Sequence, residues 1–300
     1  MGMKGYKGFR KGLICKSKQY AENTIFEESE ANICVFCKNP MDVLDYYPLI
    51  DNNGEMCEFS EVEAMDETLT NDEKKYCTKK LKIGARLSLV EFIKASFDVT
   101  YRQIKEEVDN VSEKENVVDN AKLAGGDNAK LAGGNGAKLA GGNWAKLAGG
   151  DWATLAGGDW ATLAGGYGAK LAGGNGAKLA GGDNATLAGG NGATLAGGYN
   201  AKLAGGNGAT LAGGYGAKLA GGNGAKLAGG NGAKLAGGKH SIMVSENGGR
   251  AKGGMGSVIV MVERNDEGEI VNYKAIQIDG DKYKEDTWYR LEDGEIKEVE

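Results

Sequence analysis

The sequence predicts a mainly β protein whose centre is a β-solenoid, a rod of stacked coils built from short strands. From residue 121 to 240, the octapeptide Ala-(Lys/Thr)-Leu-Ala-Gly-Gly-x-x occurs fifteen times in succession, without an insertion or a deletion. Leucine holds the third place of every copy, from Leu123 to Leu235. With two glycines in each copy and eight more in the variable places, this segment contains 38 of the 52 glycines of the chain.

Each copy is typical of a short strand followed by a tight corner. In an extended Ala-Lys-Leu-Ala stretch alternate side chains share a face, so Leu123 should point inward and Lys122 outward. The Gly-Gly-Asn-Gly type of sequence that follows tolerates positive φ, as a corner requires. Two copies therefore make a 16-residue coil with two opposed flat faces. Coils stacked at about 4.8 Å would form a rod about 36 Å long.

Glycine-rich disorder, or a silk-like tract, is the alternative interpretation of this composition. A disordered segment has no physical reason to keep one large apolar residue at every eighth position. A ladder of buried leucines explains that spacing.

Residues 1–120 are predicted to form an α+β domain that caps one end of the rod, because an open solenoid end exposes unpaired strand edges. Asn39 and Pro40 indicate the start of a helix. The elements expected in this domain are that helix from Pro40 to about Tyr47, strands at Glu55–Glu63 and Thr78–Ile83, and helical segments between Ser88 and Glu107.

At the other end, the repeat period continues with larger residues, as in residues 241–244 (Ser-Ile-Met-Val). The solenoid is therefore expected to span residues 121–256, regular to 240 and degenerate afterwards. Residues 265–268 (Asn-Asp-Glu-Gly) predict a hairpin turn. Residues 257–300 are predicted to form a β-meander that caps this end.

Charge is distributed unevenly along the chain, whose formal net charge is −5. Residues 1–120 carry 17 Lys and Arg against 23 Asp and Glu, residues 121–240 carry 11 against 4, and residues 241–300 carry 8 against 14. A basic rod thus lies between acidic ends. The lysines are interpreted as a solvated face that discourages aggregation, or as a polyanion-binding face. Nucleic acid is not favoured, because the array lacks arginine and its aromatic residues do not interleave with the lysines.

The large aromatic residues of the array are the candidate binding or assembly residues. In 16-residue coils the three tyrosines fall on one edge, and the three tryptophans, in successive copies, alternate between the two edges. The alternative for the tryptophans is that they only cover the early coils. The six residues are Tyr167, Tyr199, Tyr215, Trp144, Trp152 and Trp160.

The array resembles the repeats of bacterial ice-nucleation proteins. The likeness rests on the octad spacing and on residues 166–169 and 214–217, both Gly-Tyr-Gly-Ala. It implies 16-residue coils and an outward Thr-x-Thr face that orders water. The comparable triplets here, such as residues 154–156 (Thr-Leu-Ala) and 170–172 (Lys-Leu-Ala), lack the second threonine.

A second resemblance covers the whole chain. Residues 4–9 (Lys-Gly-Tyr-Lys-Gly-Phe), residues 36–44 (Phe-Cys-Lys-Asn-Pro-Met-Asp-Val-Leu) and residues 286–289 (Asp-Thr-Trp-Tyr) are similar to segments of uncharacterised proteins common in bacteriophages and prophages. In those proteins a small domain of unknown function precedes an octapeptide array, usually of Ser-Ala-Ala type, and a β-rich tail follows. The resemblance implies a phage or prophage origin and a modular plan, but no reaction.

Residues suited to catalysis or metal binding are sparse. Cys34 and Cys37 have C-x-x-C spacing and are weak candidates for a zinc or redox pair, but zinc would need ligands from the other three cysteines. The only histidine, His240, is expected in a corner of the array. No phosphate-binding glycine motif is present. No catalytic residue and no cofactor are therefore predicted.

The leading hypothesis is a non-enzymatic phage or prophage protein that uses a rigid solenoid for binding or self-assembly, with itself or a host protein as partner. It could then antagonise a host process. The alternatives are an enzymatic or metal-binding activity in the N-terminal domain, with the solenoid as spacer, and the organisation of ice or water. No signal-peptide pattern and no run of about 18 apolar residues occur. We therefore expect a cytoplasmic location in a bacterial host and no membrane partner.

Overall fold

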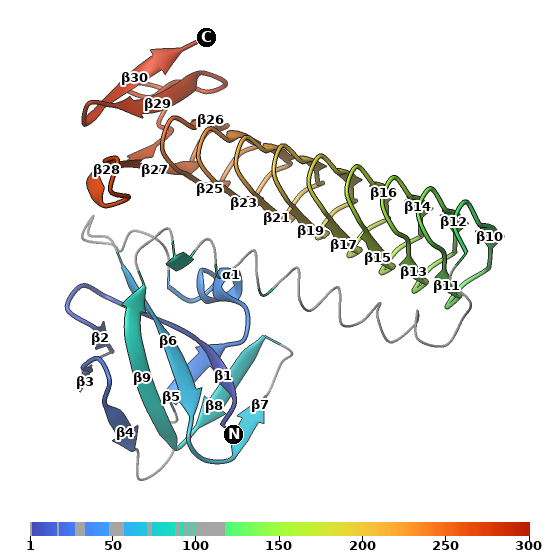
Figure 1. Ribbon diagram of the computed structural model, residues 1–300. Coiled ribbons are helices and arrows are strands. Elements are labelled where there is room, and N and C mark those ends of the chain that lie inside the picture. Colours follow the sequence, from blue (N-terminus) through green and yellow to red (C-terminus); the bar gives the residue numbers. More distant parts are fainter. Residues whose placement is uncertain are drawn as a thin grey trace. The chain divides into compact units, whose positions relative to one another are not determined.

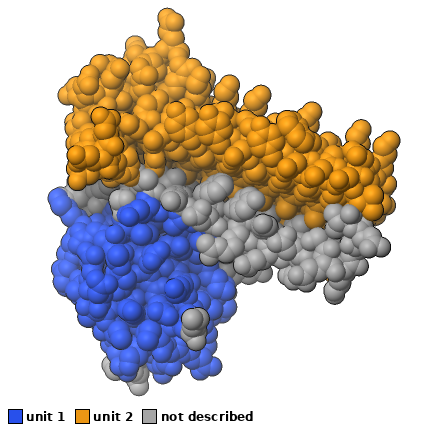
Figure 2. All heavy atoms as spheres, in the orientation of Figure 1, with its two compact units in different colours: residues 1–99 blue, residues 100–300 orange. Residues whose placement is uncertain are grey.

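The computed structural model describes residues 2–16, 18–27, 34–47, 57–70, 74–87, 91–92, 95, 99 and 118–300. The chain divides into two compact units, Met1–Val99 and Thr100–Glu300, which are coloured separately in Figure 2. Strands account for 49% of the structure and helices for 3%, so the expected mainly β class is confirmed. None of the helices in the described ranges has the length and hydropathy of a membrane span.

The first unit is built on a seven-stranded sheet with the strand order β4-β9-β6-β1-β5-β8-β7 (Figure 1). All its pairings are antiparallel. Its strands are β1 (Lys4–Phe9), β4 (Ile25–Glu27), β5 (Cys34–Cys37), β6 (Glu58–Ala64), β7 (Thr68–Thr70), β8 (Lys75–Thr78) and β9 (Lys80–Leu87). A separate hairpin pairs β2 (Ile14–Cys15) with β3 (Lys18–Gln19).

The helix of this unit is shorter than expected. Helix α1 (Pro40–Val43) begins at the predicted proline, but turn bonds such as Tyr46 N–H to Val43 C=O (3.0 Å) follow it directly. Pro48 disfavours helical conformation in Tyr47, which limits the helix on that side. The helical segments expected between Ser88 and Glu107 lie largely outside the described residues.

In the second unit, successive octapeptides alternate between two parallel sheets, and about nine turns of solenoid span residues 122–261 (Figure 1). The first sheet contains β10 (Lys122–Ala124), β12 (Lys138–Ala140), β14 (Thr154–Ala156), β16 (Lys170–Ala172), β18 (Thr186–Ala188), β20 (Lys202–Ala204), β22 (Lys218–Gly221), β24 (Lys234–Gly237) and β26 (Arg250–Lys252). The second sheet contains β11 (Lys130–Ala132), β13 (Lys146–Ala148), β15 (Thr162–Gly165), β17 (Lys178–Gly181), β19 (Thr194–Gly197), β21 (Thr210–Gly213), β23 (Lys226–Gly229), β25 (Ile242–Ser245) and β27 (Val258–Arg264).

Strands in each sheet pair with a partner sixteen residues away, as Leu171 pairs with Leu187. The coil of two octapeptides is therefore confirmed. From the second coil onward the alanine at the first place and the leucine at the third are almost completely buried, whereas the leucine of the first strand, Leu123, is 37% exposed. The interior is thus a thin layer of leucine and alanine that lies open at its first coil. That residues 1–120 cap this end stays a prediction.

From the second copy onward, the two consecutive glycines of each copy leave no room for a side chain. A Cβ atom at Gly173 would lie 2.6 Å from the Cβ of Ala177, which is part of the core. A Cβ atom at Gly174 would lie 2.1 Å from Oδ1 of Asp159, one coil earlier. The first glycine is thus fixed by the core and the second by the corner of the preceding coil.

Beyond residue 240, β25, β26 and β27 keep the register of the repeat. The chain then adds antiparallel strands to both sheets: β28 (Ile270–Gln277) pairs with β27, and β29 (Trp288–Glu292) pairs with β26 and with β30 (Glu295–Val299). The hairpin turn expected at residues 265–268 lies between β27 and β28, where Gly268 has a φ of 85°.

Candidate binding surface at the corners of the solenoid

The variable residues of the repeat form two rows of corners, one along each edge of the rod. We call the asparagine corner the row that follows the first sheet: residues 127–128, 143–144, 159–160, 175–176, 191–192, 207–208, 223–224 and 239–240. We call the tyrosine corner the row that follows the second sheet: residues 119–120, 135–136, 151–152, 167–168, 183–184, 199–200, 215–216 and 231–232.

The asparagine corner is held by a continuous ladder of side-chain hydrogen bonds. Oδ1 of each Asn or Asp at the seventh place accepts the backbone N–H of the equivalent residue one coil later, from Asp127 to Lys239, at 2.7–2.9 Å. Asparagine and aspartate serve equally because only Oδ1 is used. This ladder joins eight successive corners.

In the tyrosine corner the same ladder is interrupted. Its bonds run from Asp119 to Tyr167 and from Asp183 to Tyr199. Within residues 118–300 no such bond follows Tyr167, Tyr199 or Tyr215, since a tyrosine side chain carries no acceptor near the backbone. Each tyrosine in this row therefore removes one bond between coils.

The three tryptophans occupy the eighth place, where the backbone is left-handed. Trp144, Trp152 and Trp160 have φ angles of 61°, 60° and 59°, at a place held elsewhere by glycine, asparagine or His240. Left-handed backbone costs an L-residue about 1–2 kcal/mol, and it is unusual for a bulky one. The tryptophans are 55–64% exposed, so burial of their rings does not repay that cost.

The structure brings the six candidate aromatic residues together in three ring pairs. Trp144 stacks on Trp160 in the asparagine corner, with ring centroids 5.5 Å apart. In the tyrosine corner, Trp152 meets Tyr167 edge-on at 5.2 Å, and Tyr199 stacks on Tyr215 at 5.4 Å. The three tyrosines thus share one edge, as their spacing indicates, but Tyr167 contacts a tryptophan rather than another tyrosine.

The tyrosines and tryptophans carry costs that offset part of what their ring contacts contribute. An aromatic pair contributes about 0.5–1.5 kcal/mol. A lost ladder bond costs about 0.5–1.5 kcal/mol, and each left-handed tryptophan costs about as much again. Three ring pairs stand against six unfavourable placements, and the tyrosines remain 44–57% exposed. The fold therefore does not by itself require rings at these six places.

The two cysteines with C-x-x-C spacing, Cys34 and Cys37, are the first and last residues of β5 in the first unit. Cys37 is buried, and the side chain of Cys34 lies outside the described residues. No group of three or more His, Cys, Asp or Glu residues in the described ranges is placed to hold a metal ion. The zinc or redox pair stays a prediction.

Two polar contacts in this unit were not foreseen from the sequence. Sγ of Cys15 lies 2.7 Å from the hydroxyl of Tyr47, and burial together with this contact raises the pKa of Tyr47 above its usual range. The ammonium group of Lys7, which is 3% exposed, donates to the backbone carbonyl of Val35 at 2.9 Å. Lys7 lies on the same face of β1 as the buried Gly5 and Phe9.

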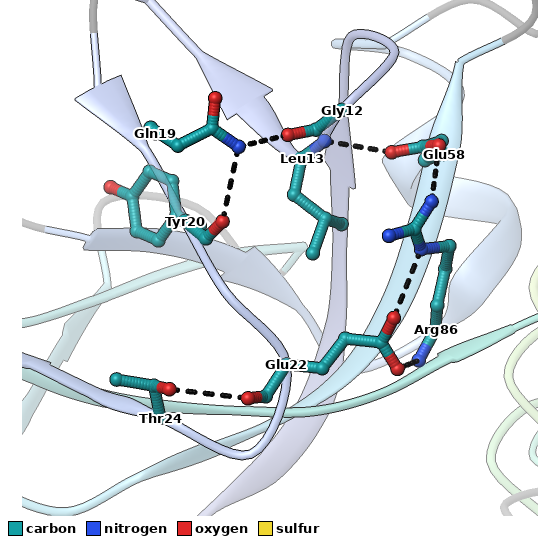
Figure 3. A network of polar contacts seen from close by, with 8 residues as sticks. All are labelled: Gly12, Leu13, Gln19, Tyr20, Glu22, Thr24, Glu58 and Arg86. Carbon is teal, nitrogen blue, oxygen red and sulfur yellow. Dashed lines mark hydrogen bonds and ion pairs between the residues drawn. The ribbon is translucent and has the colours of Figure 1, made fainter.

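A polar network on the same unit ties its strands together (Figure 3). The guanidinium of Arg86 pairs with Glu22 at 3.2 Å and with Glu58 at 2.6 Å, and Glu58 also accepts the backbone N–H of Leu13 at 2.7 Å. Gln19 donates to the carbonyl of Gly12. Every carboxylate in the network is paired within the domain, so its role is structural.

Comparisons with known proteins identify one part of the chain. No curated protein and no solved structure matches it. Residues 3–95, which contain every strand of the seven-stranded sheet of the first unit, match a family model described as a domain of unknown function, DUF7666, so the chain carries a DUF7666 domain at its N-terminus.

Proposed function

We propose that this is a non-enzymatic repeat protein of phage or prophage origin whose solenoid self-associates through the tyrosine corner. The observation that carries the proposal is the broken ladder: three tyrosines replace ladder residues in one corner and leave their rings exposed. Exposed aromatic residues on a rigid support are typical of protein contacts. The phage or prophage origin rests on the sequence resemblance described above.

The test compares the two corners by light scattering. A tyrosine-corner variant carries Tyr167→Asn, Tyr199→Asn and Tyr215→Asn, which supply ladder acceptors in place of rings. The matched control carries Trp144→Asn and Trp160→Asn in the asparagine corner. We expect the wild type and the control to have a multiple of the 31.3 kDa chain mass, and the tyrosine-corner variant to be monomeric. A monomeric wild type, or a variant that assembles like the wild type, contradicts the proposal.

Two alternatives have separate tests. Metal analysis of the purified protein and of a Cys34→Ala, Cys37→Ala variant addresses a metal-binding N-terminal domain. An ice-recrystallisation assay addresses water organisation. A host protein as the partner of the tyrosine corner, with antagonism of a host process, would leave the isolated protein monomeric, and the mass measurement distinguishes it from self-association.

A further inference from the structure

The outward face of the first sheet carries a row of cations. Lysine or arginine holds the second place of the repeat in seven of the nine copies that form this sheet, and threonine holds it in the other two. The cations are Lys122, Lys138, Lys170, Lys202, Lys218, Lys234 and Arg250. Within the described residues none of these six lysines lies in an ion pair. At the end of the row, Arg250 stacks on Trp288, and the neighbouring Lys252 pairs with Asp286 at 3.3 Å.

Part of this row places like charges directly opposite one another, which lowers the stability of the sheet. Lys202 pairs directly with Lys218, Lys218 with Lys234, and Lys234 with Arg250. Like charges directly opposite one another in a sheet are destabilising. Four such residues in succession, one per coil at about 4.8 Å, indicate that the positive charge has a use outside the fold.

The face is also flat and open. The fourth place of each first-sheet repeat is alanine as far as Ala236, and these alanines are exposed up to Ala220. The second sheet differs: the equivalent Ala180, Ala196 and Ala228 are at most 1% exposed. The first sheet therefore presents exposed small side chains beside a line of lysines.

Tryptophan lies in both rows of corners, each of which separates the two sheets and therefore flanks this face as well as the opposite one. Trp144 and Trp160 lie in the corner that follows the first-sheet strands, and Trp152 lies in the corner that precedes them. A linear polymer lying along the lysines would contact one border, whereas a planar surface contacts the face and both borders together. Lysines that attract anionic headgroups, with tryptophan at the level of those headgroups, are the arrangement of a peripheral membrane contact.

We propose that the first sheet of the solenoid binds an anionic lipid surface. The contact is peripheral and needs no spanning segment, so it goes beyond the proposed self-association and uses different residues. It differs from the expectation of no membrane partner, which considered spanning segments only. The acidic ends of the chain oppose it weakly, because charges beyond about 8 Å are screened at physiological salt.

The test is sedimentation of the full-length protein with phosphatidylcholine vesicles, with and without phosphatidylserine. The first-sheet variant carries Lys202→Gln, Lys218→Gln and Lys234→Gln, and the matched control carries the second-sheet changes Lys130→Gln, Lys146→Gln and Lys226→Gln. Each lysine near the surface contributes about a fivefold factor in partitioning. The first-sheet variant should therefore bind phosphatidylserine vesicles about a hundredfold more weakly, and the control much less so. Tryptophan emission should shift to the blue on binding.

The outcomes separate this proposal from its rivals. An absence of phosphatidylserine-dependent sedimentation at low salt overturns it, and so does an equal loss in both variants. Tighter binding of single-stranded DNA, with the same dependence on the first-sheet lysines, assigns the face to a nucleic acid instead. Light scattering in the absence of vesicles tests self-association separately, because the lysine variants retain the tyrosine corner. Unchanged circular dichroism shows that both variants fold.

Discussion

The asparagine corner and the tyrosine corner have the same backbone and different surfaces. Both make the same hydrogen bonds between coils, as Gly176 donates to Asn191 and Asn184 donates to Tyr199. They differ in the seventh residue of the repeat, which supplies a ladder acceptor in one row and an exposed ring at three positions of the other. The comparison shows that the corner fold does not depend on the ladder, so this position is available for a contact surface.

The largest effect expected from this comparison concerns the second glycine of the pair. In Gly174→Ala, the new Cβ meets Oδ1 of Asp159 at 2.1 Å, whereas in Gly182→Ala, above Tyr167, the nearest atom is a backbone carbon at 3.0 Å. We expect Gly174→Ala to destabilise the protein by about 3 kcal/mol and Gly182→Ala by about 1 kcal/mol. Urea unfolding followed by circular dichroism measures both. Equal losses would show that the ladder side chain does not constrain its corner.

A medium effect is expected from the ladder itself. Asn191→Ala removes the acceptor for the backbone N–H of Asn207 and should cost about 1 kcal/mol. Tyr199→Asn supplies an acceptor to Tyr215 but loses the ring stack, so its net effect should lie within about 0.5 kcal/mol of zero. Thermal unfolding at one protein concentration compares the two changes. Asn191→Ala is made in the tyrosine-corner variant, which is expected to be monomeric. If Asn191→Ala leaves the melting temperature unchanged, the ladder bonds contribute no measurable stability to the asparagine corner.

The smallest effect is expected where the tyrosine corner ends. Glu246 occupies the place of the second glycine, and burial raises its pKa above the usual range of a glutamate although Arg264 opposes the shift. A raised folded-state pKa contributes stability below the unfolded pKa, and this is lost as pH rises through the folded value. Glu246→Gln should thus match the wild type at pH below about 4 and exceed it slightly, within about 0.5 kcal/mol, at neutral pH. Melting temperatures at both pH values check the sign, and a variant that is less stable at neutral pH would contradict it.

The solenoid could be predicted because each repeat contains the local sequence pattern of one strand and one corner. Leu123 to Leu235 recur at a fixed spacing, so one inward position determines all the others, and counting in sixteens assigns the aromatic residues to rows. The ladder was missed, although asparagine, aspartate and tyrosine share the seventh place and the loss of acceptors could have been inferred from that exchange.

The first unit was harder to predict because its sheet is built from distant segments. Strand β1 lies between β5 and β6, so that Tyr6 pairs with both Cys37 and Glu61. No local pattern encodes a partner thirty or fifty residues away. The buried position of Lys7 follows from this pairing, which explains why the sequence did not reveal it.

The alternation of octapeptides between two sheets makes the array sensitive to the parity of its copy number. Gain or loss of sixteen residues would lengthen or shorten the rod and leave each face unchanged. Gain or loss of a single octapeptide, for instance between Asp183 and Tyr199, would rotate everything downstream by half a turn. Tyr199 and Tyr215 would then leave the row of Tyr167, and the run of first-sheet lysines would be divided between two faces. Recombination that adds or removes an even number of near-identical repeats would therefore change the length of the rod and keep the residues of each face. An odd number would also move the downstream residues to the opposite face.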